Sequence, residues 1–419
     1  MKKREIKPIR SLDHEITLPG SKSYTARALV ISALASGKTV LLNPLFSEDT
    51  EYMIRGLRAL GISIEKIQED LWIKGGGGTF HPTIETLYLG GAGTAVRFLT
   101  TVAGLTQRPI VIDGNSRMRE RPIQDLLDGI EPLGIKARCI DGNGCPPVLV
   151  EAGQFEGGRT QLRGEKSSQF LSSILLCSPY AQREVVIETM GDLVSGSYVD
   201  LTIEIMKEFG GKVRVEDGRR YRVHPSPYLG RTYSIEGDLS SASYFLAAAA
   251  ITGGRVVVKG APASSKQGER GFIDILESMG CLVHWGDHMV EVTGRNLQAV
   301  EVDMKTMPDT VQTLAVVAAF AKGWTRILHI DHLRYKETDR LTALRKELSK
   351  IGIATLLEKE ALLIQGGNPR GAEIETYQDH RMAMAFAVLG LRVPGMVIQD
   401  PDCVNKSMPT FWTLLEGLG

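Results

Sequence analysis

The amino-acid sequence predicts an α/β protein in which one unit of helices and short strands is repeated six times. Two observations support this prediction. A charged helical segment that ends in glycine recurs six times, and its terminal glycines are 67 to 76 residues apart. A small apolar helical segment, followed by a β-branched strand, precedes each charged copy. Self-similarity at such a period indicates a repeat architecture in which neighbouring units share buried surface.

The charged segments have apolar residues at helical spacing on one face, so we expect amphipathic helices on the outside of the fold. In each copy the final glycine occupies the position where a left-handed residue ends a helix. The six segments are Met53–Gly61, Leu126–Gly134, Leu201–Gly210, Phe272–Gly280, Leu344–Gly352 and Phe411–Gly419.

The apolar segments are rich in small and aliphatic residues and carry few charges, so we expect them to form buried helices. They are Ala28–Ala35, Ala95–Gly104, Phe170–Cys177, Ala242–Ala250, Val311–Ala321 and Met382–Leu389. A turn and a β-branched strand follow each segment. These strands are Thr39–Leu42, Ile110–Ile112, Val185–Ile187, Val256–Val258, Ile327–Leu328 and Val397–Ile398.

The composition is that of an ordinary globular protein of 419 residues, with 49 basic and 49 acidic side chains. Because the net charge is zero, no overall field favours nucleic acid or an anionic membrane, and any anion site must come from local clustering. The five cysteines contain no Cys-x-x-Cys pair, which favours a reducing cytoplasm over a disulfide framework. The longest apolar runs are too short to span a bilayer, and the basic N-terminus lacks the apolar core of a signal peptide.

The stretch Leu18–Arg27 contains a candidate anion site. A Pro-Gly pair interrupts any preceding strand, and Ser21 or Ser23 is placed to cap the helix that follows. Lys22 and Arg27 then lie near a helix N-terminus, where the backbone N–H groups and the macrodipole already attract anions. The stretch is either a capped helix with two solvated charges or a binding site for a phosphate or carboxylate.

Cations recur at other predicted helix starts, although the macrodipole disfavours them there. The cations at these starts are Lys22, Arg27, Arg117, Lys336, Arg340, Arg381 and Lys406. A rule broken this often indicates a functional site. If these helix starts converge, they form a pocket for a ligand that carries more than one phosphate or carboxylate.

Two acidic residues stand out in this basic setting. Taken alone, Asp309 is explained as a helix N-cap and Glu337 as a helical partner of Arg340. Familiar phosphate motifs do not fit: Gly20–Ser23 lacks the first glycine of a P-loop, and Gly90–Gly93 lacks the third glycine of a dinucleotide fingerprint. No spacing of His, Cys and carboxylate residues resembles a zinc site.

Nine segments, in the same order and spread over essentially the whole chain, resemble the 5-enolpyruvylshikimate-3-phosphate synthase family of enolpyruvyl transferases. They are Leu18–Arg27, Gly91–Arg97, Arg117–Pro122, Ser167–Leu171, Glu236–Phe245, Met307–Asp309, Lys336–Arg340, Asp379–Met384 and Asn405–Pro409. The number and order of the segments make the resemblance specific.

The resemblance implies two domains, each made of three βαβαββ-type units around buried central helices, which is the inverse α/β barrel of this family. One domain is expected at residues 20–235 and the other at residues 1–19 plus 236–419, with hinge crossings near 18–20 and 235–238. The resemblance also implies a monomeric enzyme that acts on small molecules, without a metal or organic cofactor and without nucleic-acid or membrane partners.

The implied reaction transfers the enolpyruvyl group of phosphoenolpyruvate to the 5-hydroxyl of shikimate 3-phosphate and releases phosphate. It belongs to the shikimate pathway, which leads through chorismate to the aromatic amino acids. By the resemblance, Asp309 is the base that takes the 5-hydroxyl proton, and Glu337 is a proton relay to or from the pyruvyl methylene carbon. Lys22 is expected between the two substrates.

The resemblance also implies which residues bind each substrate. Shikimate 3-phosphate is expected to contact Lys22, Ser23, Arg27, Ser167, Ser168, Gln169, Ser195, Tyr198, Asp309, His332 and Lys336. Phosphoenolpyruvate is expected to contact Lys22, Gly93, Arg117, Gln169, Arg340, Arg381 and Lys406. Retention of Gly93, which leaves room for the inhibitor glyphosate in this family, predicts that glyphosate binds.

The sequence departs from the family pattern at four positions. The family usually has Asn where Ala26, Gly91 and His332 stand, and Pro where Phe98 stands. The change at Gly91 removes a side-chain donor beside the expected phosphoenolpyruvate site, and His332 replaces an amide contact to shikimate 3-phosphate.

Two other functions stay open on the residues alone. One is the related UDP-N-acetylglucosamine enolpyruvyl transferase, which shares the sixfold fold but uses a loop cysteine that Asp113–Pro122 lacks. The other is a non-catalytic, clamp-like binding protein, since repeated α/β units also build clamps.

Overall fold

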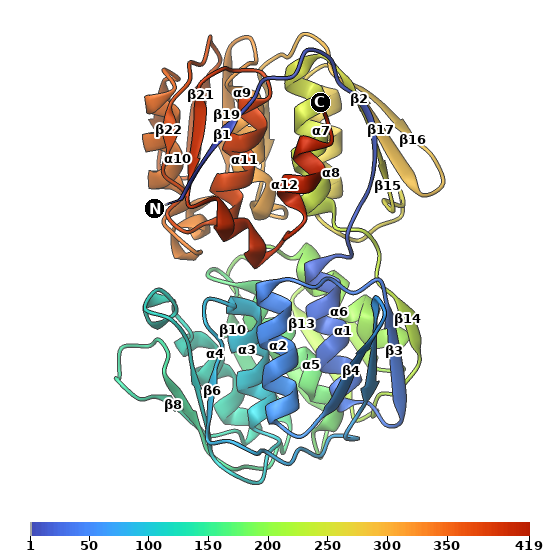
Figure 1. Cartoon of the computed structure of the whole chain (residues 1–419). Coiled ribbons are helices and arrows are strands. Elements are labelled where there is room, and N and C mark those ends of the chain that lie inside the picture. The colour runs from blue at the N-terminus through green and yellow to red at the C-terminus, as the bar shows by residue number, and fades with distance from the viewer. Residues whose placement is uncertain (1) are drawn as a thin grey trace. The chain divides into compact units, whose positions relative to one another are not determined.

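The computed structural model describes residues 2–419, and the chain divides into two compact units (Figure 1). Unit 1 comprises Met1–Pro19 and Glu236–Gly419, and unit 2 comprises Gly20–Ile235. The chain therefore leaves unit 1 after its first strands and returns to it near residue 236. In the part of the chain that the structure describes, each unit contains three small sheets and six α-helices.

The six apolar segments form buried helices, as predicted. They are α1 (Lys22–Leu34), α3 (Gly93–Ala103), α5 (Ser168–Cys177), α7 (Leu239–Thr252), α9 (Val311–Ala318) and α11 (His380–Gly390). Almost every side chain of these helices is buried. Their small residues allow close helix contacts, and each large aliphatic side chain that they bury contributes about 1.5–3 kcal/mol.

The six charged segments form the second set of helices, which is also confirmed. They are α2 (Glu48–Ala59), α4 (Gln124–Ile130), α6 (Ser197–Glu208), α8 (Arg270–Ser278), α10 (Arg340–Lys350) and α12 (Phe411–Glu416). The first five predicted terminal glycines have positive φ angles between +84° and +106°. The prediction is wrong for Gly419, because the short helix α12 ends earlier, at Gly417, in the right-handed conformation.

Short 3₁₀ turns connect several of these elements, and four of them lead toward the next α-helix along the chain. The 3₁₀ turns are η1 (Met118–Glu120), η2 (Glu131–Leu133), η3 (Ser178–Tyr180), η4 (Pro308–Thr310), η5 (Asp331–Tyr335) and η6 (Pro401–Lys406). Among residues 2–419, no helix combines the length and the apolar character needed to cross a bilayer.

Unit 2 contains three four-stranded sheets. The first has the order β14 (Thr232–Ser234), β3 (Lys38–Leu42), β5 (Asp70–Lys74) and β4 (Ser63–Ile67). The second has the order β6 (Thr86–Tyr88), β7 (Ile110–Asp113), β9 (Val148–Val150) and β8 (Ala137–Cys139). The third has the order β10 (Gly158–Arg163), β11 (Val185–Met190), β13 (Arg220–His224) and β12 (Lys212–Glu216).

Unit 1 contains two four-stranded sheets and one three-stranded sheet. The first has the order β16 (Leu282–Trp285), β17 (Met289–Thr293), β15 (Arg255–Lys259) and β2 (Asp13–Thr17). The second has the order β18 (Glu301–Asp303), β19 (Trp324–Leu328), β21 (Ala361–Gln365) and β20 (Thr355–Leu357). The third has the order β1 (Lys3–Ile6), β23 (Met396–Gln399) and β22 (Glu373–Ile374).

All six sheets share one pairing pattern, in which a parallel pair is extended by antiparallel strands. In the second, third, fifth and sixth repeats the buried helix connects the two parallel strands. In the first five repeats the last two strands form an antiparallel hairpin. The first five repeats therefore have the order βαβαββ, whereas the sixth runs β22, α11, β23 and α12 and is extended by β1. The six-copy α/β fold is confirmed.

Two leading strands pair outside the repeat that follows them in the chain. Strand β2 precedes α1 but pairs in parallel with β15, and β14 precedes α7 but pairs in parallel with β3. The chain thus crosses between units after a leading strand and before a buried helix. Strand β1 likewise joins β23, so that the dark-blue N-terminal strands lie among the yellow-to-red elements of unit 1 (Figure 1).

Each unit has its own hydrophobic core around its three buried helices. In unit 1, α7 packs against α8, α9 and α11 and against the sheet strands β15 and β17. In unit 2, α1 packs against α2, α5 and α6, and α3 packs against α2 and α5. The first turns of these helices position the residues described next.

Candidate active site

The start of α1 places Lys22 beside an acidic residue of the next helix. The Lys22 Nζ lies 3.1 Å from Oδ2 of Asp49, in the first turn of α2, and both side chains are mostly buried. Ser21 occupies the N-cap position, but its side chain makes no capping hydrogen bond, and Ser23 lies inside the helix. The predicted serine cap is therefore wrong. Asp49 was not singled out from the sequence, because nothing in its local pattern distinguishes it from other acids in a first helical turn.

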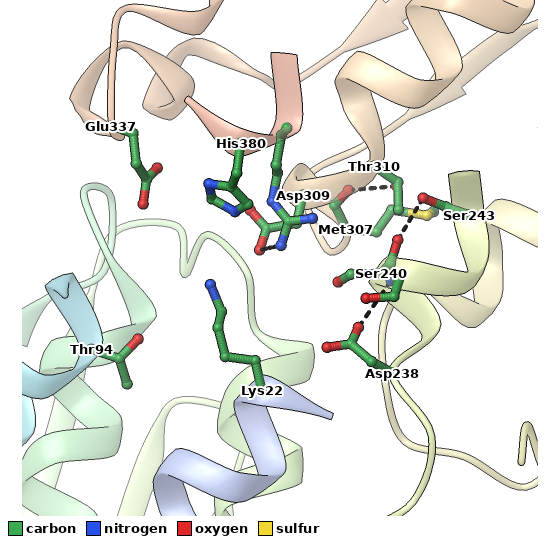
Figure 2. A network of polar contacts seen from close by, with 12 residues as sticks. Lys22, Thr94, Asp238, Ser240, Ser243, Met307, Asp309, Thr310, Glu337 and His380 are labelled. Carbon is green, nitrogen blue, oxygen red and sulfur yellow. Dashed lines mark hydrogen bonds and ion pairs between the residues drawn. The ribbon is translucent and has the colours of Figure 1, made fainter. Parts of the chain in front are cut away.

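A chain of hydrogen bonds fixes the starts of α1 and α2 against each other. The Thr25 hydroxyl donates to the Ser21 carbonyl at 2.8 Å and accepts from the backbone N–H of Leu45 at 3.0 Å. The Thr50 hydroxyl donates to the Leu45 carbonyl at 2.8 Å, and Thr50 forms a capping box with Ser47. These hydrogen bonds therefore hold the backbone of Lys22 in a defined place. Figure 2 shows Lys22 at the start of α1.

Arg27 is a buried cation that contacts two predicted site residues, Ser23 and Tyr198, and two further neighbours, Thr202 and Phe98. Its Nε donates to the Thr202 hydroxyl at 2.6 Å, and its Nη1 donates to the Ser23 carbonyl at 3.0 Å. The guanidinium also lies over the rings of Phe98 and Tyr198, with its central carbon 5.3 Å and 5.8 Å from the ring centroids. These contacts fix the guanidinium plane and supply cation–π attraction in a desolvated setting.

The start of α5 connects to the start of α3 through Gln169. Ser167 is the N-cap of α5, and its hydroxyl accepts from the backbone N–H of Gln169 at 3.3 Å. The Gln169 side-chain amide donates to the Thr94 hydroxyl at 3.2 Å. Ser168 is buried at the first position of the helix. Gln169 therefore links the starts of α3 and α5, because it contacts the hydroxyl groups of both Thr94 and Ser167.

Gly93 packs against the end of an arginine side chain. A Cβ at this position would lie 2.8 Å and 2.9 Å from the two terminal nitrogens of Arg121. Arg121 is buried, and Arg97 ties its loop to α3 by donating to the carbonyls of Gly93 and Pro122 at 3.3 Å and 3.2 Å. Arg121 was missed as a site residue, although it lies in the arginine-rich segment at 117–122. Arg117 of the same segment is half-exposed and pairs with Glu120 at 2.8 Å.

Ser195 lies in a strained turn before α6. Its φ angle is +56°, a conformation that costs free energy for a residue other than glycine. Its hydroxyl is buried and has no hydrogen-bond partner among residues 2–419. Such a buried, unsatisfied group is typical of a ligand site or a water site.

In unit 1, Asp309 lies between two arginines. Its carboxylate accepts from Nη1 of Arg340 at 3.2 Å and from Nη2 of Arg381 at 2.5 Å. Asp309 lies in η4, whereas the N-cap of α9 is Thr310, so the N-cap explanation of Asp309 is wrong. The contacts place a carboxylate of limited exposure in a cationic environment. Figure 2 shows Asp309 on the short turn that runs from Met307 to Thr310.

Arg340 is surrounded by three carboxylates. Besides Asp309, it contacts Glu337 through Nη2 at 2.9 Å, which confirms the predicted i,i+3 ion pair, although Glu337 lies before α10 and not within it. Its Nε and Nη2 also contact the two carboxylate oxygens of Asp379, at 2.7 Å and 3.3 Å. The side chain of Arg340 is only 1% exposed. Burial lowers the pKa of Arg340, but the three carboxylates outweigh this and raise it.

Asp379 also organises the start of α11. It is the N-cap, and its carboxylate accepts from the backbone N–H of Arg381 at 2.9 Å. The Arg381 guanidinium donates to the Tyr244 hydroxyl at 3.2 Å. Burial raises the pKa of Tyr244 to about 12, against the lowering effect of Arg381. Asp379 was seen in the sequence only as part of a helix start, and its role in holding Arg340 was missed.

The remaining predicted residues of unit 1 lie in η5, directly after it, or in η6. His332 is 4% exposed, and its Nε2 has no hydrogen-bond partner among the described residues. Burial, and secondarily the charge of Lys336, lowers the pKa of His332 to about 3. Lys336 follows η5 directly, and Lys406 is buried at the end of η6. Within residues 2–419, no three or more His, Cys, Asp or Glu side chains are arranged to hold a metal ion.

The two units thus present different chemistry. Unit 2 offers Lys22, Arg27 and Arg121 together with serine, threonine and amide groups at helix starts, which suits an anion rich in hydroxyls. Unit 1 offers a carboxylate between two arginines, with a further acid on one of them. A carboxylate held among cations is able to accept a proton while the cations stabilise negative charge that develops nearby.

Comparison with known proteins identifies the family to which these residues correspond. A family model described as EPSP synthase (3-phosphoshikimate 1-carboxyvinyltransferase) matches residues 6–415. A 3-phosphoshikimate 1-carboxyvinyltransferase of Methanoculleus marisnigri is 44% identical over 412 residues, covering 97% of each chain. One from Sulfurovum sp. is 42% identical over 420 residues, covering 99% of this chain and 98% of the relative.

Solved structures give the same result. An EPSP synthase from Acinetobacter baumannii superposes with a TM-score of 0.84 at 26% sequence identity. The match covers 100% of this chain and 98% of the other chain. The similarity in sequence and in structure therefore extends over the whole length of the chain.

Proposed function

Because the chain belongs to the EPSP synthase (3-phosphoshikimate 1-carboxyvinyltransferase) family, we propose that it transfers the enolpyruvyl group of phosphoenolpyruvate to the 5-hydroxyl of shikimate 3-phosphate. The products are 5-enolpyruvylshikimate 3-phosphate and phosphate. This reaction lies in the shikimate pathway of aromatic amino-acid biosynthesis. The structural observation that supports it most is the Asp309 carboxylate, which two arginines hold.

The proposed reaction is an addition followed by an elimination. Asp309 takes the proton of the 5-hydroxyl, the oxygen attacks C2 of phosphoenolpyruvate, and the methylene carbon gains a proton to give a tetrahedral phospho-ketal. The ketal then loses phosphate and a methyl proton, which forms the carbon–carbon double bond of the enol ether product. Glu337 serves as the relay for the carbon proton, and Lys22 stabilises charge on the reacting groups.

Electrostatics explains why such a reaction needs many cations. Both substrates carry phosphate and carboxylate groups, and like charges about 5 Å apart repel by roughly 3 kcal/mol at an effective dielectric constant near 20. Several such pairs form when the substrates meet. Arginine suits these groups because its planar fork binds a carboxylate or a phosphate through two nitrogens.

We assign the substrate contacts by residue. Shikimate 3-phosphate is bound by Lys22, Ser23, Arg27, Ser167, Ser168, Gln169, Ser195, Tyr198, Asp309, His332 and Lys336. Phosphoenolpyruvate is bound by Lys22, Gly93, Arg117, Gln169, Arg340, Arg381 and Lys406. In unit 2, the buried Arg27 with its Ser23 and Tyr198 contacts supports the first set. In unit 1, the buried Arg340 and Arg381 support the second.

Several further features are part of the proposal. The chain crossings near 18–20 and 235–238 act as hinges, the enzyme is a monomer located in the cytoplasm, and glyphosate binds where Gly93 leaves space. The monomer is tested by light scattering of the purified chain. The five cysteines, all free in the described residues, agree with a reducing compartment.

One assay tests the function directly. Phosphate release from phosphoenolpyruvate is followed with shikimate 3-phosphate as acceptor and, separately, with UDP-N-acetylglucosamine. We expect release only with shikimate 3-phosphate. Release only with the nucleotide sugar would indicate the related transferase, and no release with either would indicate a non-catalytic protein.

A further inference from the structure

A fully buried carboxylate, Glu347, lies behind the arginines of unit 1. It is on α10, seven residues after Arg340, and therefore on the same face of the helix. Its two oxygens accept hydrogen bonds from the Tyr377 hydroxyl at 2.7 Å, from Lys350 Nζ at 2.7 Å and from the backbone N–H of Glu375 at 3.1 Å. Two of these donors belong to the segment that leads into α11.

That segment contains a strained turn. Tyr377 and Gln378 have φ angles of +55° and +56°, in the left-handed region that residues other than glycine rarely adopt. Two such residues in succession persist only where the surrounding structure imposes them. The next residue is Asp379, which holds Arg340 through both oxygens and caps α11 at Arg381.

The segment is therefore attached to α10 at two points. Tyr377 and Glu375 bind Glu347 at one end, and Asp379 binds Arg340 at the other, about two turns away along the same helix face. The left-handed turn lies between these two attachments. Its conformation determines where the Asp379 carboxylate lies, and Asp379 in turn contacts the guanidinium of Arg340 and the backbone N–H of Arg381, at the start of α11.

We propose that Glu347 and Tyr377 are positioning residues for phosphoenolpyruvate binding: their hydrogen bond holds the strained turn that places Asp379, and thereby Arg340 and Arg381. This inference rests on the proposed function, which assigns the two arginines to phosphoenolpyruvate. Neither Glu347 nor Tyr377 is among the residues assigned to either substrate.

The chemistry of the pair suits this role. Burial, together with the hydrogen bond to Glu347, raises the pKa of Tyr377, so the phenol stays protonated and remains a donor. A hydrogen bond to an ionised acceptor is stronger than one between neutral groups and is comparable in size with the strain of the turn. Lys346 lies over the Tyr377 ring, with Nζ 5.3 Å from the centroid, and further limits its movement.

The primary test is the variant Tyr377→Phe, which removes the hydroxyl and keeps the ring. We expect the KM for phosphoenolpyruvate to rise about tenfold, the effect of losing roughly one hydrogen bond to a charged group. The KM for shikimate 3-phosphate should change much less, because most of its assigned contacts lie in unit 2, away from this turn. Glu347→Gln should act in the same direction.

A matched control separates positioning from stability. Tyr180 of unit 2 is, like Tyr377, a partly buried tyrosine; its hydroxyl donates to the Leu34 carbonyl, at 2.5 Å, and accepts from the backbone N–H of Tyr228, at 3.0 Å. Tyr180→Phe should lower the unfolding temperature without changing the KM for phosphoenolpyruvate. If Tyr377→Phe behaves in the same way as Tyr180→Phe, the positioning role is contradicted.

A rescue variant tests the strained turn itself. Gln378 is exposed, and glycine adopts its left-handed conformation without steric cost. Gln378→Gly, added to Tyr377→Phe, should restore most of the affinity for phosphoenolpyruvate. Gln378→Val alone should raise the KM, because a β-branched residue resists this conformation. An unchanged KM in Tyr377→Phe, or the absence of rescue by glycine, would overturn the proposal.

A structural readout keeps this proposal separate from the proposed function. The crystal structure of Tyr377→Phe should show a relaxed turn and a displaced Asp379 that no longer contacts Arg340 Nε. Retention of the turn and of that contact would contradict the positioning role whatever the activity. Absence of phosphate release in the wild-type enzyme would instead contradict the proposed function.

Discussion

Arg340 joins the two acids to which the proposed mechanism gives different tasks: its Nη1 lies 3.2 Å from Asp309 and its Nη2 lies 2.9 Å from Glu337. One buried guanidinium therefore contacts both acids, and a displacement of one acid is felt at the other through Arg340. Asp379 holds the same guanidinium from a third side. Arg340 therefore holds Asp309, Glu337 and Asp379 at fixed positions relative to one another.

Removing the base should abolish the chemistry without unfolding the protein. Asp309→Asn is expected to lower the rate of phosphate release about 10²–10⁴-fold, the usual contribution of a general base. Arg340 keeps Asp379 and Glu337 as partners, so the fold should remain intact. Steady-state kinetics and circular dichroism measure the two effects.

A matched control for this variant is Asp303→Asn, which alters an exposed aspartate of the same unit that pairs with His329. It should leave turnover unchanged. Full activity in Asp309→Asn would contradict the assignment of the base.

Lys22 is predicted to be essential for turnover but not for folding. Lys22→Ala removes a cation that is mostly buried and paired with Asp49, and the hydrogen bonds between the starts of α1 and α2 do not involve its side chain. Phosphate release should fall to background, while the unfolding temperature should shift by only a few degrees. Lys66→Ala, at an exposed lysine of the same unit, is the control. Measurable turnover in Lys22→Ala near the wild-type rate would exclude the role assigned to it.

His332 should make the free energy of unfolding depend on pH. Its pKa is lowered from 6.5 to about 3, so between these values the unfolded chain binds a proton that the folded protein does not. The free energy of unfolding then rises with pH by about 1.4 kcal/mol per unit across this window, and falls as the pH drops below 6.5.

His332→Asn removes this contribution. Between about pH 6.5 and pH 5 the variant should lose about 2 kcal/mol less of its free energy of unfolding than the wild type. Urea unfolding at several pH values measures the difference, with His288→Asn, at an exposed histidine of unit 1, as the matched control. Identical pH dependence in His332→Asn and the wild type would show that the imidazole is not held neutral by the fold.

Gly93 should control the response to glyphosate. The wild-type enzyme is expected to be inhibited by glyphosate at millimolar concentration or below. In Gly93→Ala the new Cβ would lie 2.8 Å from Arg121 Nη1, so the guanidinium must move. We expect weaker binding of both glyphosate and phosphoenolpyruvate, measured as the inhibition constant and the KM. Inhibition that Gly93→Ala leaves unchanged would place the inhibitor elsewhere.

The repeat made most of the fold predictable from the sequence. The alanine-rich segment at 242–250 and its five counterparts became buried helices, and glycines such as Gly61 and Gly280 ended the amphipathic ones with positive φ. Local patterns suffice there because burial and backbone conformation depend on residues close in the chain. Local patterns could not predict that β2 pairs with β15 and β14 with β3. The pairing of β2 with β15 joins residues more than 200 positions apart in the chain.

The site was predictable where charge broke a helix rule, and not where partners came from elsewhere in the chain. Lys22 and Arg340 stood out because cations are disfavoured at helix starts. Their partners Asp49 and Asp379 did not, because an acid in a first helical turn or at an N-cap is ordinary. The predicted serine cap of α1 is wrong. The hydroxyl that bonds the start of α1 is that of Thr25, inside the helix, which donates to the Ser21 carbonyl and accepts from the Leu45 N–H.

The most direct test of the account identifies the product itself. Phosphoenolpyruvate labelled at its C2 carbon is incubated with shikimate 3-phosphate and the enzyme, and the label is followed by nuclear magnetic resonance. The account predicts that the label moves into an enol ether of shikimate 3-phosphate, with one phosphate released for each ether formed. Label that stays in phosphoenolpyruvate, or that appears only as pyruvate, would contradict it.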